Sequence, residues 1–353
     1  MLQVRFRIQA DVFWDPKEKQ VKMVKRFLVC AAASLPLLAV VDAAQAQEAV
    51  SVRLRWVTQT QFAGVYVALE KGFYKEAGLN VKINPGGPNV STESLVASGA
   101  DHFAVSGATD SMLFAREKKL PVVAIGMSLQ TTPYAFVSHK DSSIKSIKDF
   151  AGKTASAWFT GSQYQLYTAL HHEGMDPKAV NVVSQPFSMQ PFIDGKYDIS
   201  TVTLYNELLV LKDKNVPVNL FRADAHGVRG QDNAIITSEK MVQQKPEVVQ
   251  AFLNATLRGW KYAIQNQAEA VDIVMKAGSG LNKGHQTNML AAYAELMTTG
   301  TGRSKGLGWV DLDAARTVHD NLVKFSALKA PVDVAPAFTN QFWDKVPAEY
   351  KQP

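Results

Sequence analysis

Eight aromatic residues fall in or beside the loops that follow predicted β-strands. In an open α/β sheet these loops are where ligands bind. A single aromatic at such a position usually belongs to the packed rim of the sheet. Several at the same edge favour a site for a planar ring, because each stacked pair contributes on the order of 1 kcal/mol beyond the area it buries. The eight are Trp56, Phe62, Tyr66, Trp158, Phe159, Tyr164, Phe187 and Tyr205.

Hydrogen-bonding side chains lie in the same loops. Asn206 and Glu207 open a predicted helix, where an acid also suits the helix dipole. A carboxylate there can instead accept from a ring amino group, and the amide can donate or accept. Gly64, at the start of the helix after Trp56, is expected to let a ligand approach the backbone. The predicted ligand-binding residues are Trp56, Gln61, Phe62, Tyr66, Asn84, Ser106, Thr109, Trp158, Ser162, Ser188, Tyr205, Asn206 and Glu207.

Signals for catalysis or metal binding are poor. The seven histidines include no His-x3-His pair, and the sequence has no P-loop and no G-x-G-x-x-G motif. Cys30 is the only cysteine, and it lies in the N-terminal segment discussed next. A chain without that segment has no disulfide, zinc thiolate site or cysteine nucleophile. We therefore expect no catalytic residue, no cofactor and no metal.

The N-terminus has the three parts of a secretory signal. Basic residues precede an apolar run at 27–41, and the small-x-small sequence Ala-Gln-Ala follows at 44–46. The run is shorter than the ~20 residues of a spanning helix, which is the reason for preferring a signal peptide to a membrane anchor. We expect residues 1–46 to be the signal peptide, with Met23 as its natural start. The mature chain would begin at or near Gln47 and be periplasmic.

The remaining sequence reads as two α/β units followed by helices. With 353 residues, 46% of them hydrophobic, the chain can build two ordinary domains. The net charge of +6 is scattered, and no basic run interleaves with aromatics, which excludes a nucleic-acid partner. Strands alternate with helices, which favours mostly parallel sheets covered on both faces. We expect lobe 1 over 47–130, lobe 2 over 131–231, and completion of lobe 1 with a helical tail over 232–353.

Four stretches resemble a known family: FAGVYVALEKGFYKEAGLNVKI, LVASGADHFAVSGATDSMLFAREKKLPVVAI, SIKSIKDFAGKTASA and KPEVVQAFLNATLRGWKYAIQNQAEAVDIV. Together they are similar to periplasmic substrate-binding proteins of ABC importers, in the group that takes up nitrate, sulfonates, taurine and the pyrimidine precursors of thiamine. The resemblance covers about residues 50–340. It implies an α/β, two-lobed periplasmic binding protein fold, type II-like, with a hinge of two crossings and a helical C-terminal tail.

The ligand class is open at this stage. Oxyanion binders need basic side chains and other donors, and the loops WVTQTQFAG, SGATD, WFTGSQY and LYNE contain no Lys or Arg. A thiamine pyrimidine precursor is therefore the first expectation, riboflavin the second and an aromatic carboxylate the third. Nitrate, sulfonate or taurine binding is a further alternative. The resemblance also extends to pyrimidine synthases, which depend on an active-site histidine and a cysteine-rich iron motif; here, a signal peptide and a cysteine-free mature chain argue against an enzyme.

The resemblance also implies how the protein would work and with which partners. Two lobes joined by a hinge would close on a small-molecule ligand. The closed form would dock on a membrane permease, and its ATPase would drive release. We expect a monomer with no nucleic-acid partner. A periplasmic sensor using the same cleft is the alternative to an importer component.

Overall fold

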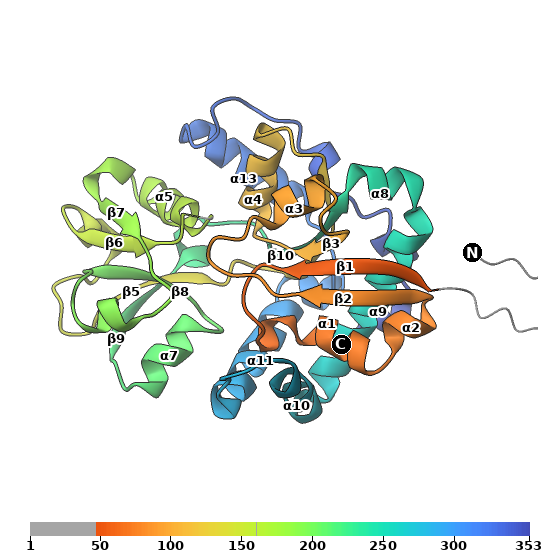
Figure 1. Cartoon of the computed structure of the whole chain (residues 1–353). Helices are drawn as coiled ribbons and strands as arrows, with labels where there is room; N and C mark the ends of the chain where they lie inside the picture. The colour runs from red at the N-terminus through yellow and green to blue at the C-terminus, as the bar shows by residue number, and fades with distance from the viewer. Residues whose placement is uncertain (1–46, 160) are drawn as a thin grey trace, which may run out of the picture. The chain divides into compact units, whose positions relative to one another are not determined.

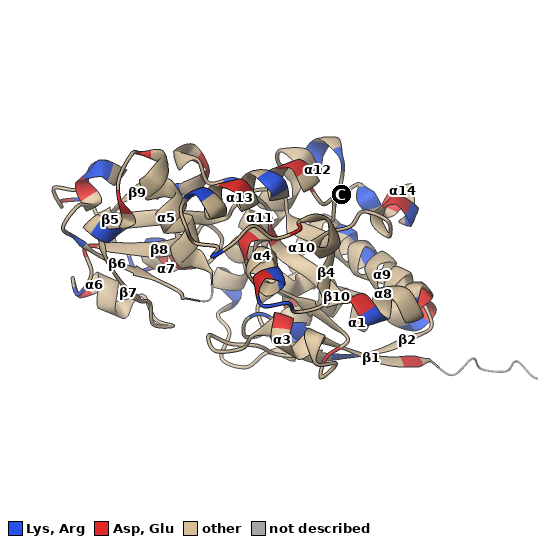
Figure 2. Cartoon of the chain, turned by 90° about the horizontal axis from the view of Figure 1, so that it is seen from above, with Lys and Arg blue, Asp and Glu red and all other residues tan. Residues whose placement is uncertain are grey.

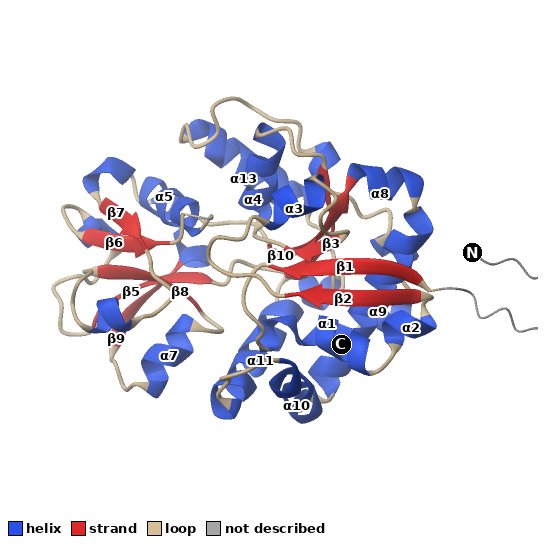
Figure 3. Ribbon diagram, in the orientation of Figure 1, coloured by secondary structure: helices blue, strands red, loops and turns tan. Residues whose placement is uncertain are grey.

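The computed structural model describes residues 47–159 and 161–353. The expected signal peptide, including Met23 and Cys30, lies outside the described residues. Within them, ten strands form two five-stranded sheets (Figure 1, Figure 3). The chain passes from the first sheet to the second after β4 and returns before β10.

The first sheet has the order β2-β1-β3-β10-β4, and β10 is the antiparallel member. Every residue of β4 is buried, although β4 lies at one edge of this sheet. The strands are β1 (Glu48–Leu54), β2 (Leu79–Asn84), β3 (Phe103–Val105), β4 (Val122–Leu129) and β10 (Asp232–Ser238).

The second sheet repeats this layout in the order β7-β6-β8-β5-β9, with β5 as the antiparallel strand. In each sheet the antiparallel strand is the one the chain enters directly from the other sheet. The mostly parallel arrangement predicted from the sequence is confirmed. The strands are β5 (Tyr134–His139), β6 (Thr154–Ala157), β7 (Asn181–Ser184), β8 (Ile199–Thr203) and β9 (Val218–Arg222).

Helices follow the strands, and after β10 the described chain has no further named strand, only helices and loops (Figure 3). Helices of the first α/β unit are α1 (Ala63–Glu70), α2 (Phe73–Glu76), α3 (Thr92–Ala97) and α4 (Thr109–Glu117). Those of the second are α5 (Ser162–His172), α6 (Gln190–Ile193) and α7 (Glu207–Asp213). The tail comprises α8 (Glu239–Gln244), α9 (Pro246–Gln265), α10 (Gln267–Ala277), α11 (Lys283–Thr298), α12 (Thr301–Ser304), α13 (Leu312–Lys324) and α14 (Ala348–Lys351).

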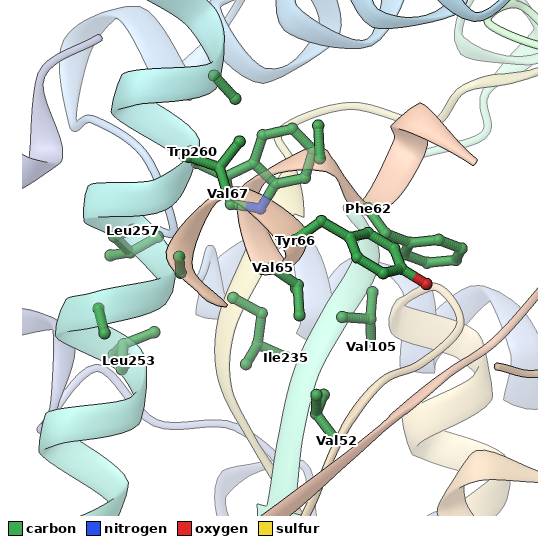
Figure 4. Packing of buried hydrophobic residues seen from close by; sticks show 14 of the residues in the cluster. Val52, Phe62, Val65, Tyr66, Val67, Val105, Ile235, Leu253, Leu257 and Trp260 are labelled. Carbon is green, nitrogen blue, oxygen red and sulfur yellow. The ribbon is translucent and has the colours of Figure 1, made fainter. Parts of the chain in front are cut away.

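The close packing of α1 on α9 corrects the expectation for Gly64. A Cβ at Gly64 would lie 2.3 Å from Cγ of Trp260, and a Cβ at Gly259 would lie 2.1 Å from the Gly64 carbonyl oxygen. Figure 4 shows Trp260 lying beside Val67 of α1. Gly64 therefore makes room for an indole of the core and not for a ligand, because helix–helix contact needs small residues where the backbones approach closely.

The start of α1 is not a bare helix N-terminus. A 3₁₀ turn, η1 (Thr60–Phe62), precedes the helix, and Thr60 donates from its backbone N–H and its hydroxyl to Gln286. The helical segment is also interrupted, since Gly72 has φ +75° between α1 and α2. A left-handed residue ends one helix and starts the next.

Residues of both charge signs are distributed over the described part of the chain. Figure 2 shows Lys and Arg interspersed with Asp and Glu over the helices. Among the described residues, no helix combines the length and the apolar character that crossing a bilayer requires.

Candidate functional site

A pocket lies between the two sheets at the ends of β1, β6 and β8. About 430 Å³ of space free of protein atoms lies in it, a volume that includes open solvent. The first sheet contributes the segment after β1 and η1, and the second sheet contributes the starts of β5, α5 and α7. The lining residues are Arg55, Trp56, Gln59, Gln61, Tyr134, Trp158, Ser162, Thr203, Tyr205, Asn206 and Glu207.

Aromatic rings from both sheets meet at this pocket. Trp56 stacks on Phe187 with ring centroids 5.4 Å apart and an interplanar angle of 9°. Trp158 meets Trp56 edge-on, with centroids 6.3 Å apart. Because Phe187 covers one face of the Trp56 indole, a planar ligand can stack only on the other. Nε1 of Trp158 is buried and has no hydrogen-bond partner among the described residues, which leaves a donor for a ligand.

Trp56 is held in place by its backbone. The chain leaves β1 at Leu54, and Gly86 donates its N–H to the Trp56 carbonyl at 2.9 Å. A Cβ at Gly86 would lie 1.9 Å from the Leu54 carbonyl oxygen. Glycine is therefore needed where the loop after β2 crosses back against the segment that carries Trp56.

Arg55 brings a positive charge that the sequence analysis did not place in the site. Its Nη1 donates to Oδ1 of Asp232 at 2.6 Å, and its Nη2 lies 3.3 Å from the Tyr134 hydroxyl. About 20% of the Arg55 side chain is exposed. The expectation of a site without a basic side chain is therefore wrong. Because Asp232 compensates the charge of Arg55, the pocket is nevertheless not cationic.

Glu207 lies on the opposite wall of the pocket, and its carboxylate oxygens already accept three hydrogen bonds. Glu207 Oε2 accepts from the backbone N–H and the hydroxyl of Thr203, at 3.0 and 2.6 Å. Its Oε1 accepts from Nδ2 of Asn206 at 2.7 Å. A carboxylate offers about four lone-pair directions, so one remains for a ligand. Glu207 thus stabilises the turn after β8 and also lines the pocket.

A second buried acid links the two sheets behind the pocket. Asp110 is only 2% exposed, and its Oδ2 lies 2.6 Å from Nε2 of Gln165 on α5. Its Oδ1 accepts from the Ser111 backbone. Burial raises the pKa of Asp110 to about 7, with a further increase from the charge of Asp232, against the lowering effect of the Gln165 hydrogen bond.

The structure brings seven of the predicted ligand-binding residues to the pocket and leaves six elsewhere. Trp56, Gln61, Trp158, Ser162, Tyr205, Asn206 and Glu207 line it. Phe62 and Tyr66 are core residues, with the Tyr66 hydroxyl bonded to Thr58. The others serve local structure: Asn84 donates to Asp101, Ser106 to Glu93 and Thr109 to the Gln231 carbonyl, while the Ser188 hydroxyl accepts from the Gln190 N–H.

Three of the four lining residues that the prediction missed are next to, or close to, a predicted one. Gln59 lies in the same polar loop as Gln61, Thr203 ends the strand before Tyr205, and Arg55 precedes Trp56. Tyr134, the first residue of β5, had no signal, because it enters from the first crossing between the sheets and not from a parallel strand end. Phe187 was noted as an aromatic of these loops but not chosen.

A wider groove adjoins the pocket and shares Arg55 and Trp56 with it. It contains about 1,540 Å³ of free space, including open solvent. Its walls include the loop 87–94, Ser111, Phe159 and Tyr164. The loop after β2 therefore lines this groove, although Asn84, a predicted ligand-binding residue, does not.

Ser304 lies in a sequence with the spacing of a hydrolase nucleophile motif, but it does not lie in the structural context of such a nucleophile. Gly302-Arg303-Ser304-Lys305-Gly306 fits G-x-S-x-G, a motif that acts at a sharp turn from a strand into a helix. Here Ser304 ends the short helix α12 and is exposed, and its hydroxyl donates to the Thr301 carbonyl. Within the described residues, no group of three or more His, Cys, Asp and Glu could hold a metal ion.

Several curated proteins are similar in sequence to this chain over much of its length. The riboflavin-binding protein RibY of Chloroflexus aurantiacus is 29% identical over 302 residues, covering 83% of this chain and 85% of the relative. A formylaminopyrimidine-binding protein of Halalkalibacterium halodurans is 30% identical, over 65% of this chain and 71% of its own. A 4-amino-5-hydroxymethyl-2-methylpyrimidine phosphate synthase of Legionella pneumophila is 25% identical over 65% of this chain and 73% of its own.

The fold has solved counterparts. The periplasmic aliphatic sulphonate binding protein SsuA of Escherichia coli superposes with a TM-score of 0.64 at 13% identity, covering 82% of this chain and 91% of SsuA. That likeness confirms the expected two-lobed periplasmic binding protein fold. The sequence profile of the family described as NMT1/THI5 like matches residues 59–270. This match spans more than half of the chain, and the chain belongs to the NMT1/THI5 like family.

Proposed function

We propose that this protein is the periplasmic solute-binding component of an ABC importer and that it captures a small planar heteroaromatic ligand in the pocket. It would deliver the ligand to a membrane permease whose ATPase drives release. The observation that carries the ligand class is the pocket lining. Four aromatic side chains, Trp56, Tyr134, Trp158 and Tyr205, surround a site whose one lining cation among the described residues is paired with Asp232.

An aminopyrimidine of the thiamine-precursor type is the first candidate. Glu207 retains an acceptor direction for a ring amino group, and Nε1 of Trp158 offers a donor for a ring nitrogen or a carbonyl. A relative named for formylaminopyrimidine binding supports the same class.

Riboflavin is the second candidate because a specific observation favours it. The groove that shares Arg55 and Trp56 with the pocket gives a larger ligand somewhere to extend. The relative named for riboflavin binding also covers more of this chain than the pyrimidine-binding relative. An aromatic carboxylate is the third candidate, held by the remaining N–H groups of Arg55.

Nitrate, sulfonates and taurine fit the pocket less well. Binding an anion there would place it near the carboxylate of Glu207, while the charge of Arg55 is already compensated by Asp232. Like charges in a desolvated site oppose binding. A pyrimidine synthase is disfavoured because the family resemblance ties that activity to a cysteine-rich motif, and the one cysteine of this chain, Cys30, lies in the expected signal peptide.

A panel of ligands tests the class directly. Thermal melts would be recorded with 4-amino-5-hydroxymethyl-2-methylpyrimidine, formylaminopyrimidine, riboflavin, benzoate, nitrate, sulfate and taurine. A ligand at 100 times its Kd stabilises by about 2.7 kcal/mol, which raises the Tm by roughly 4 °C for a chain of this size. Calorimetry on each hit gives the affinity. A shift with taurine or nitrate and none with the aromatic compounds would overturn the proposal.

The partner protein that binds this chain distinguishes a role in import from a role in sensing. In proteoliposomes that contain the permease and its ATPase, the ligand-loaded protein should stimulate ATP hydrolysis more than the ligand-free protein does. Binding of the ligand with no stimulation, together with capture of a chemoreceptor, would favour a periplasmic sensor.

A further inference from the structure

His285 joins the two walls of the site from outside the pocket. It lies in the first turn of α11, and its side chain is 15% exposed. Its Nε2 is 2.9 Å from Oδ1 of Asn206, and its Nδ1 is 3.3 Å from Oδ2 of Asp213. Both partners belong to the second sheet's side, at the two ends of α7. Figure 3 shows α7 and α11 facing each other where the two sheets adjoin.

The hydrogen-bond geometry fixes the protonation that this contact needs. Nδ2 of Asn206 donates to the Glu207 carboxylate at 2.7 Å, so the oxygen of the Asn206 amide must face His285. Asp213 presents a carboxylate oxygen to the other ring nitrogen. Both ring nitrogens therefore face acceptors, and only an imidazolium, which donates from both, satisfies them.

The charges around His285 agree with this arrangement. Asp213 faces it directly, and Glu207 lies one hydrogen bond away through Asn206. Lys283, on the same helix turn, is paired with Asp272 of α10. The charged groups around His285 therefore sum to a net negative charge.

Gln286, the residue after His285, contacts the pocket wall that the first sheet contributes. Gln286 accepts the Thr60 backbone N–H at 2.8 Å through Oε1, and its carbonyl accepts the Thr60 hydroxyl at 2.9 Å. Thr60 lies between Gln59 and Gln61, which both line the pocket. Consecutive residues at the start of α11 thus fix pocket segments that come from the two different sheets.

We propose that His285 is a positioning residue that holds the Asn206–Glu207 wall of the pocket in place through its imidazolium form. Ligand capture is then coupled to proton uptake at this residue, and affinity is greater at acidic than at alkaline pH. The ligand half of this inference rests on the proposed function, whereas the contact between α7 and α11 does not.

The first test needs no ligand. Spin labels at Lys214→Cys on the α7 side and Asn288→Cys on α11, in a Cys30→Ser background, report the separation of the two helices by pulsed electron resonance. The ligand-free protein should show a short, narrow distance distribution at pH 5.5 and a longer or broader one at pH 8.0. His285→Gln should show one distribution at both pH values, and Asp213→Asn should show a reduced difference.

The second test measures affinity by calorimetry, in two buffers of different ionisation enthalpy, with 4-amino-5-hydroxymethyl-2-methylpyrimidine and riboflavin as probes. Binding should take up protons and be about fivefold tighter at pH 5.5 than at pH 8.0, at the low end of typical coupling between sites. His285→Gln should remove the pH dependence. His226→Gln, which breaks a histidine–carboxylate pair with Glu173 within the second unit, should retain it.

The two tests separate the two proposals. Distances that do not change with pH, or binding whose pH dependence survives in His285→Gln, would refute the role of His285 and leave the ligand class untouched. A pH-dependent distance in a protein that binds neither probe would support the role of His285 and count against the proposed ligands.

Discussion

Asp110→Asn should make the protein more stable at pH 8 and leave its stability at pH 4 unchanged. Asp110 is the second residue of α4, and burial raises its pKa to about 7. The folded protein therefore holds a proton that the unfolded chain releases near pH 4. Stability from this group falls as the pH rises from about 4 to about 7 and stays constant above that value. An asparagine has no proton to lose, so the variant avoids this fall.

The magnitude follows from the two pKa values. The ordinary value is 3.8 and the folded value about 7, and each pH unit between them is worth about 1.4 kcal/mol, so the upper bound is about 4 kcal/mol. The gain in stability of Asp110→Asn at pH 8 should approach this upper bound, because the substitution has no steric cost. Its Oδ1 can accept from Ser111, and its Nδ2 can donate to Gln165 once that amide turns over, as a protonated Asp110 would.

Urea unfolding at pH 4, 6 and 8, followed by fluorescence and circular dichroism, measures the effect. Asp313→Asn is the matched control, because Asp313 is also the second residue of its helix but its side chain is 92% exposed. The control should change the free energy of unfolding by less than about 0.5 kcal/mol at each pH. If Asp110→Asn destabilises equally at pH 4 and pH 8, the helix dipole and the Ser111 N–H outweigh burial, and the reasoning is wrong.

Three further predictions concern the pocket and the core. Trp56→Ala should weaken binding of the best ligand of the panel by about 10- to 100-fold, since it removes a stacking face and its buried area; calorimetry showing unchanged affinity would mean that the ligand binds elsewhere. Glu207→Gln should lower both the affinity and the free energy of unfolding, the latter by about 1–3 kcal/mol, because an amide cannot accept from all three donors that the carboxylate serves; unchanged unfolding would show that those hydrogen bonds contribute little. Gly64→Ala should destabilise by about 1–3 kcal/mol by displacing the Trp260 indole, whereas Gly87→Ala, with nothing within 4 Å of the added Cβ, should be neutral in thermal melts; equal effects would refute the packing argument.

Local pattern was enough to predict the elements and the fold class. The helix α9, Pro246–Gln265, can be recognised from the sequence, because apolar residues at helical spacing and Pro246 at the first position both act within a few residues. Loops after parallel strands meet at one edge by topology. For that reason the sequence alone could place Trp56, Trp158 and the Tyr205–Glu207 turn at one site.

Only the tertiary structure decided which side chains of those loops reach the pocket. Phe62 and Tyr66 have the same local signals as Trp56, yet α9 and the first sheet bury them in the core. Gly64 looked like an approach to the backbone, but its space is filled by Trp260, about two hundred residues later in the chain. The charge of the pocket likewise depends on Asp232, whose pairing with Arg55 spans 177 positions. The sequence determines secondary structure through neighbours, whereas burial, packing and charge compensation arise from residues that meet only when the chain has folded.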